Sequence, residues 1–207
     1  MGAGMTETAL KPLFLTTVRN PRAGAGRVLG MNLPPQALWI ALSLISVVTS
    51  GVVAALVQAA PIPEGEIGVL ITASPVYSSP LIFALMQWGR AVLSVFMLYW
   101  VGRGLGGRGG IPEVLAVVTL LQAVSFILVA GCVLLGLVIP FVSSLGLLVF
   151  IVWWMWAVSN MLDVAHGFDS PLKAFGVMVI AIFGVVVGLS IIMGVIGGLF
   201  AATTGAV

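Results

Sequence analysis

Five long apolar segments dominate the hydrophobic pattern of this chain, separated by short stretches rich in proline, glycine and charged residues. The segments occupy residues 37–59, 80–101, 112–139, 144–165 and 171–200. At about 1.5 Å of rise per residue, even the shortest segment forms a helix of roughly 33 Å, enough to cross a hydrocarbon core of about 30 Å. The pattern predicts an all-α, polytopic integral membrane bundle of five transmembrane helices.

Capping residues mark several of the predicted helix ends. Ser79-Pro80 and Ser170-Pro171 each combine a capping hydroxyl with a proline suited to the first helical position. Gly167 is a natural helix stop, because glycine adopts the left-handed conformation that often ends a helix. The apolar stretch 67–73 is too short to span a bilayer, and we expect it to lie at the interface.

The composition supports a chain that faces lipid over most of its surface. Only 7% of the residues are charged, whereas soluble domains carry about 25% charged residues. Alternating spans place three groups of basic residues on one side of the membrane, which predicts a cytoplasmic N-terminus and an external C-terminus. The chain then divides into a basic cytoplasmic leader (1–36), a five-span domain (37–200) and a short external tail (201–207).

The leader mixes apolar and basic residues. Asn20-Pro21 is typical of a helix start, and the pattern predicts a short interfacial amphipathic helix over residues 21–31. The alternative is a solvated basic leader. Four residues are candidate contacts for anionic lipid headgroups: Lys11, Arg19, Arg22 and Arg27.

Arg90 is the most unusual residue of the chain, because it is the eleventh of 22 residues in the second predicted span. A charge near the bilayer midplane is costly and is expected to face the bundle interior or a wet cavity. Gln87 lies one turn away, and Gln122 and Ser125 fall at a similar depth of the third span. These four residues form a candidate intramembrane polar site, either a ligand or ion site or a structural one in which Arg90 extends toward Asp163.

The turn between the fourth and fifth spans gathers many of the remaining ionisable groups. Its candidate interaction residues are Asn160, Asp163, His166, Asp169 and Lys173. A carboxylate and an imidazole three residues apart are suited to proton relay or metal binding. A single histidine and a lone cysteine do not complete a metal site, so neither a metal nor a cofactor is predicted. The alternative is that these are ordinary polar residues at a helix end.

Small residues recur in the fifth span at the spacing that lets another helix approach closely. The pairs are Gly184 with Gly188 and Gly194 with Gly198. They predict packing against a helix of the same chain or of a second copy. Three tryptophans inside the fourth span, at positions 153, 154 and 156, are expected to pack in the core.

Three short patterns combine with this topology. They are Val18-Arg-Asn-Pro-Arg-Ala23 with Leu29, a third span that ends at Pro140 before a tryptophan-rich fourth span, and His166-Gly-Phe-Asp-Ser-Pro-Leu-Lys-Ala174. Over residues 16–200 the chain resembles the Yip domain family of Ypt/Rab-interacting membrane proteins, most of all its short bacterial members. The long cytosolic N-terminal region and the Asp-Leu-Tyr-Gly-Pro motif of the eukaryotic members are not present, so Rab-type GTPase binding is not expected.

The resemblance implies a membrane protein without enzymatic activity. We expect a module of the bacterial inner membrane that binds or organises other membrane proteins or the bilayer. The expected partners are lipids with anionic headgroups and another membrane protein or a second copy of the chain, and not nucleic acid. The alternative function is a small transporter or channel subunit with a polar path near Arg90.

Overall fold

The computed structural model describes the backbone of residues 7–136 and 138–204, and the side chains of residues 10–136, 138–139, 141–188 and 190–191. Every regular element in these ranges is an α-helix. In chain order the helices are α1 (Glu7–Arg19), α2 (Pro21–Gly30), α3 (Pro35–Ala59), α4 (Glu66–Ala73), α5 (Pro75–Ser78), α6 (Pro80–Gly104), α7 (Ile111–Gly136), α8 (Pro140–His166) and α9 (Pro171–Thr204).

The five predicted spans are confirmed as helices α3, α6, α7, α8 and α9, each long and apolar enough to cross a membrane. One boundary was wrong. Pro140 was expected to stop the third span and open a turn before a fourth span that starts at residue 144, but it begins α8. Proline at the first helical position removes an N–H that would have no helical partner, so the chain can enter α8 directly at this residue.

The leader forms two helices rather than the single predicted one. The predicted helix over 21–31 is α2, whereas α1 was missed because Pro12 interrupts its apolar pattern. Tertiary packing stabilises α1, since Leu13 and Val28 are buried together in the core. A side chain at Gly24 would overlap Thr17, so this glycine lets the two helices pack closely.

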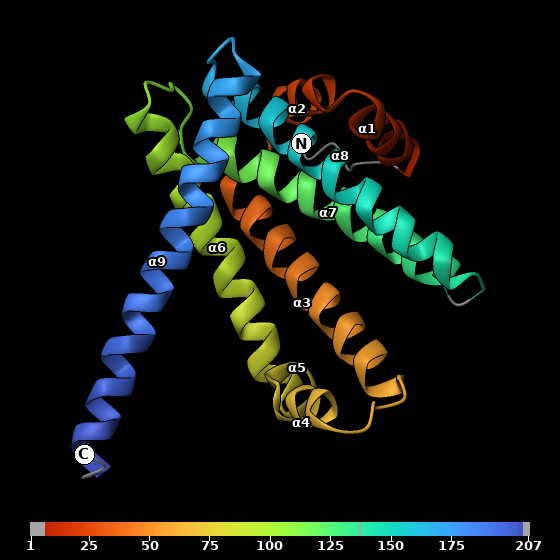
Figure 1. The fold of residues 1–207 in the computed structure, drawn as a ribbon. Coiled ribbons are helices and arrows are strands. Elements are labelled where there is room, and N and C mark those ends of the chain that lie inside the picture. Colours follow the sequence, from red (N-terminus) through yellow and green to blue (C-terminus); the bar gives the residue numbers. More distant parts are fainter. Residues whose placement is uncertain (1–6, 137, 205–207) are drawn as a thin grey trace.

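Helices α4 and α5 form the connection between α3 and α6 (Figure 1). The segment 67–73, predicted to be too short to span, lies in the eight-residue helix α4. Ile67, Val69 and Leu70 on α4 are exposed. Such an apolar surface suits a segment that lies in the membrane interface.

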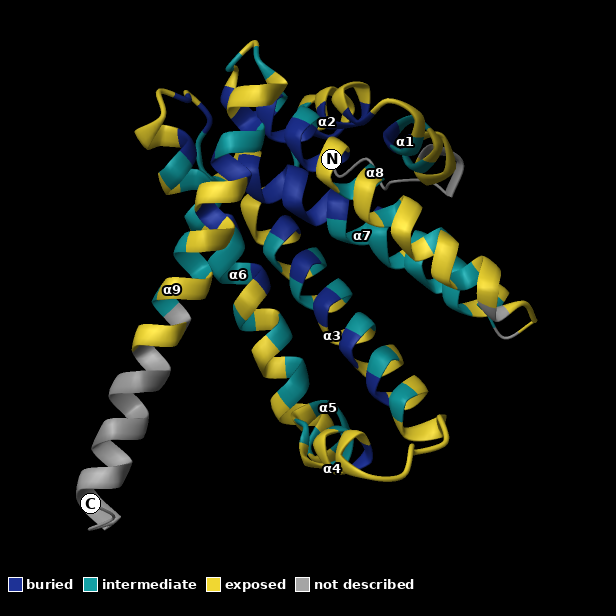
Figure 2. Ribbon diagram, viewed as in Figure 1, coloured by how far each residue is buried: buried dark blue, intermediate teal, exposed yellow. Residues whose placement is uncertain are grey.

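One end of the bundle collects the leader, the α6–α7 loop (105–110) and the α8–α9 turn (167–170) (Figure 1). We call it the basic end, because it carries seven of the eight lysine and arginine residues: Lys11, Arg19, Arg22, Arg27, Arg103, Arg108 and Lys173. Figure 2 shows that buried residues concentrate there, whereas α3, α6 and the adjacent pair α7 and α8 point in different directions toward the opposite end and leave much of their surface exposed. Exposed apolar side chains on a span are stable in lipid, so the core needs to form at one end only.

Candidate functional site at the basic end

Asp163, in the last turn of α8, is the central residue of the basic end. Its carboxylate is fully buried, with Oδ2 2.6 Å from Nη1 of Arg22 on α2. The contact is an ion pair, and this oxygen has no hydrogen-bond partner among the described residues. The other oxygen, Oδ1, accepts a hydrogen bond of 2.8 Å from the Ser170 backbone N–H. Asp163 therefore joins the leader to the α8–α9 turn.

The backbone carbonyl of Asp163 also closes the end of α8. It accepts hydrogen bonds from the N–H groups of Gly167 at 2.8 Å and Phe168 at 3.2 Å. Gly167 adopts the left-handed conformation with φ of 62°, as expected of a helix-ending glycine. One residue thus ends α8 through its carbonyl and positions the start of α9 through its side chain.

His166 is buried against the α6–α7 loop. Side chains at Gly102 or Gly107 would overlap its imidazole, so glycine at both positions makes room for the ring. The Arg108 N–H donates a 2.9 Å hydrogen bond to the His166 carbonyl. Phe168 stacks on the ring with centroids 5.2 Å apart. The glycine-rich loop therefore closes over a single buried histidine.

The two ring nitrogens of His166 have no hydrogen-bond partner among the described residues, although the Leu98 carbonyl lies close to the ring. Asp163 uses its carboxylate on Arg22 and Ser170 instead. The two residues therefore do not form the joint relay or metal site that their spacing suggested. Within the described side chains, no group of three or more histidine, cysteine, aspartate or glutamate residues could hold a metal ion.

The remaining turn residues predicted as interaction sites lie at the surface or bond locally. Lys173 on α9 places its ammonium 4.9 Å from the centroid of the Phe168 ring. Asp169 is exposed and has a φ of 54°. Asn160 donates to the Trp156 carbonyl of its own helix at 2.8 Å. Of the five predicted turn residues, only Asp163 and His166 connect separate parts of the fold through buried side chains.

The four basic leader residues predicted to contact headgroups fall into two groups. Arg22 pairs with Asp163, and Arg27 donates to the Thr16 hydroxyl at 2.6 Å, so both also hold the leader together. Lys11 and Arg19 are exposed, with no ion pair or hydrogen bond in the described structure. A further tie fixes the leader, because the Trp153 indole N–H donates to the Val18 carbonyl at 3.0 Å.

A cavity of about 450 Å³ lies between α3, α6, α7, α8 and α9. Three members of the predicted intramembrane site, Arg90, Gln122 and Ser125, line it. The fourth, Gln87, accepts a 3.0 Å hydrogen bond from Nε of Arg90. Ser46 on α3 donates to the Gln122 side-chain oxygen at 3.4 Å. The residues that the sequence placed at a similar depth thus lie around one cavity. Asp163 pairs with Arg22 instead of Arg90.

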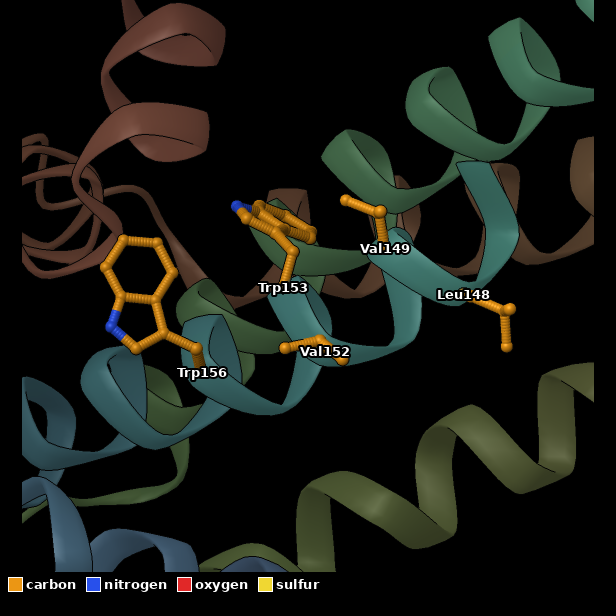
Figure 3. A pocket seen from close by; sticks show the side chains of 5 residues that line it. All are labelled: Leu148, Val149, Val152, Trp153 and Trp156. Atoms are coloured by element: carbon orange, nitrogen blue, oxygen red, sulfur yellow. The ribbon is translucent and has the colours of Figure 1, made fainter. Parts of the chain in front are cut away.

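An open hollow follows the surface of α8 (Figure 3). All of its lining side chains come from this one helix: Leu148, Val149, Val152, Trp153 and Trp156. Trp153 and Trp154 pack partly against the core, as predicted, whereas Trp156 is exposed.

The glycine pairs of the last span have unequal surroundings. A side chain at Gly184 would contact the Met97 terminal methyl on α6, which fits packing within the chain. Gly188 faces open space. Gly194 and Gly198 lie outside the residues whose side-chain surroundings are described.

Two connections of the basic end were not predicted from the sequence: the pairing of Arg22 with Asp163 and the burial of His166 under the glycine loop. Both join residues far apart in the chain, which periodicity does not place. One signal was present, because the 102–110 segment holds six glycines around two arginines. Such a density indicates close approach of another group to the backbone.

Comparison with known proteins identifies one relationship. A family profile described as the Yip1 domain matches residues 15–202, which include most of the leader and all five spans. No curated protein and no solved structure matches the chain.

We predict that Asp163→Ala detaches the leader. The change leaves the Ser170 N–H and the Arg22 guanidinium without their partner, which we expect to cost about 1–3 kcal/mol of stability. Unfolding of the detergent-solubilised protein and the rate of protease cleavage within residues 20–34 measure the effect. Asp169→Asn is the matched control, since that side chain is exposed and asparagine tolerates positive φ. Equal stability and cleavage rates for the two variants would refute the role of Asp163.

Gly102→Ala is expected to destabilise the fold by about 1–3 kcal/mol, because the added methyl group overlaps the His166 ring. Gly104→Ala, in the same helical turn with open space around it, is expected to be neutral or stabilising. The thermal unfolding midpoint compares the two. Adding His166→Ala to Gly102→Ala makes room for the methyl group, so the double variant should lose less than the sum of the two single variants. Strict additivity would contradict the close packing.

Proposed function

Because the chain belongs to the Yip1 domain family and is an integral membrane protein with five helices able to span, we propose that it is a non-enzymatic module that binds and organises the bilayer or other membrane proteins through its basic end. Members of this family are not known as enzymes. We further propose that the N-terminus is cytoplasmic, the C-terminus external and the location the bacterial inner membrane.

The observation that carries this proposal is the exposed face of α1. Lys11, Leu15 and Arg19 follow one another at four-residue spacing and are all exposed, with exposed Leu10 beside them. Residues at this spacing share one face of a helix. A face that combines leucine with lysine and arginine suits the boundary between acyl chains and anionic headgroups.

The leader is held in place rather than tethered by a flexible chain. The Arg22–Asp163 ion pair and the Trp153–Val18 hydrogen bond connect it to α8. Its basic face therefore has a constant position relative to Arg103 and Arg108 of the α6–α7 loop and Lys173 of α9. A preorganised surface binds without the cost of ordering the leader each time.

The orientation follows from the same distribution of charge. Seven basic residues at one end of the bundle favour a cytoplasmic location of that end by the positive-inside rule. The cytoplasmic leaflet carries anionic lipids that attract basic residues near the surface. The proposed orientation and the proposed lipid binding thus both follow from the basic residues gathered at one end of the bundle.

A small transporter or channel component is the second candidate function. It is favoured by the cavity between the spans, which brings Arg90, Gln122 and Ser125 to one interior surface. Anion flux through liposomes that contain the purified protein distinguishes this function from the first. Flux above that of protein-free liposomes, abolished by Arg90→Gln, would favour the transporter.

The proposed function predicts that the full chain enriches anionic lipid around itself. In vesicles with spin-labelled phosphatidylglycerol or phosphatidylcholine, we expect more immobilised phosphatidylglycerol next to the protein. The Lys11→Gln/Arg19→Gln variant should lower this selectivity several-fold at low salt, since each basic residue near an anionic surface contributes about 1 kcal/mol. Glu64→Gln/Glu66→Gln removes the same number of charges outside the basic end and should not lower it.

Unchanged lipid selectivity in the leader variant would contradict binding of the bilayer by this face. Purification from native membranes in mild detergent, followed by mass spectrometry, then tests the protein-binding form of the proposal. A stoichiometric membrane-protein partner that is lost in the same leader variant would support it. Recovery of the chain alone, together with unchanged lipid selectivity, would refute the proposed function.

A further inference from the structure

The Arg90 guanidinium has most of its hydrogen-bonding capacity unused. Its Nε donates to Gln87, and the two terminal nitrogens have no partner among the described residues. Arginine carries five N–H donors in a planar fork that matches the oxygens of a carboxylate or phosphate. Two of the described polar groups in the same cavity are also free to donate: the Gln122 side-chain amide, which only accepts from Ser46, and the buried Ser125 hydroxyl.

The described side chains supply no anion at this place. None of the residues that line the cavity is an aspartate or glutamate. Asp163 is already occupied by Arg22 and Ser170, and Glu113 accepts a hydrogen bond from the Gly110 N–H at the start of α7. A cation in the membrane interior is strongly disfavoured unless an opposite charge or water accompanies it. Water solvates such a cation in part, but an opposite charge at Arg90 has to come from outside the described part of the chain.

The rest of the cavity indicates what kind of anion fits. Away from Arg90 and the few polar side chains, its lining is aliphatic and aromatic, including Val53, Val129, Val185 and Trp154. A volume of about 450 Å³ falls within the range of roughly 300–1,000 Å³ that holds small organic ligands. An inorganic anion would satisfy Arg90 and leave the apolar lining unused. An amphiphile satisfies both, with an acidic group on Arg90 and a hydrocarbon chain along the lining.

We propose that this cavity is a binding site for one anionic phospholipid. Its phosphate oxygens accept hydrogen bonds from the terminal nitrogens of Arg90, with Gln122 and Ser125 as further donors, and an acyl chain lies along the apolar lining. The site is separate from the basic end on which the proposed function rests. The bound phosphate lies deeper than the headgroups of the surrounding bilayer, because Arg90 is eleven residues into α6.

Native mass spectrometry of the full chain in mild detergent tests the site. Titration with phosphatidylglycerol, and with phosphatidylcholine of the same acyl chains, should show one tightly held phosphatidylglycerol molecule. Arg90→Gln should weaken its binding about tenfold or more, as expected for a lost charge-assisted hydrogen bond. Arg103→Gln, which removes the same charge from the basic end, should leave this adduct unchanged, as should excess inorganic phosphate.

Four results would overturn the proposal: equal retention of both lipids by the wild type, undiminished binding by Arg90→Gln, displacement of the lipid by inorganic phosphate, or an Arg90-dependent protein partner in place of lipid. If Arg90→Gln does not fold, Ala130→Leu replaces it, because the larger side chain fills the cavity without removing a charge. This variant should weaken phosphatidylglycerol binding, and unchanged binding would overturn the proposal. Lys11→Gln/Arg19→Gln should leave the phosphatidylglycerol adduct intact. A wrong proposal for the cavity therefore gives a different result from a wrong proposal for the basic end.

Discussion

The buried carboxylate of Asp163 is the constraint on which the basic end depends. A charge removed from water or headgroups must be paired and hydrogen-bonded, and breaking such a pair is far more costly than forming it is favourable. Asp163 meets this requirement with Arg22 on one oxygen and the Ser170 N–H on the other. Arg22 lies on α2 and Ser170 directly precedes α9. The Asp163 carboxylate therefore holds the leader against the bundle and fixes the start of α9. This pairing and the Trp153–Val18 hydrogen bond together hold the exposed basic face of α1 in position.

The contrast between a packed basic end and divergent spans has a physical origin in the membrane. Lipid tails are as apolar as the side chains of a span, so hydrophobic burial does not drive helices together there. Polar ties and close approach at small residues must do so instead. The basic end has both, in the Asp163 pairing and in the glycines around His166. Farther along the spans, hydrogen bonds such as Trp88 to Ser43 join α6 to α3. Toward the other end the spans separate (Figure 2), and the cavity lies between them.

The limits of prediction from sequence follow from the same physics. Span number and length follow from apolar runs and the helical rise, which are local, so the five spans were predictable. The depth of a residue in the membrane also follows from the local sequence, because it is the number of residues from the helix end multiplied by the helical rise. This count placed Arg90, Gln122 and Ser125 at a similar depth, and all three line one cavity. Asp163 and His166 instead resembled polar residues at a helix end, because their burial comes from Arg22 and from the 102–110 segment at the end of α6 and in the α6–α7 loop, which are remote in the chain. Helix α1 was missed for a similar reason, since packing against α2 stabilises it despite Pro12.

Asp163 and Arg90 present the same problem with opposite sign. Each is a charge in a span of a chain that has very few charges, with Asp163 buried and Arg90 exposed at the cavity that it lines. For Asp163 the chain provides a cation from the leader, and the result is a structural tie. For Arg90 the described chain provides only neutral amides and a hydroxyl, which orient a guanidinium without balancing its charge. An arginine with a structural role needs a counterion from its own chain. An arginine that binds an external anion must instead keep guanidinium N–H groups available for that anion. Within the described residues, Arg90 is suited to an external anion for three reasons: its terminal N–H groups are unpaired, the cavity lining is apolar, and no carboxylate lines the cavity. Anionic phospholipid is the source of such an anion in a membrane.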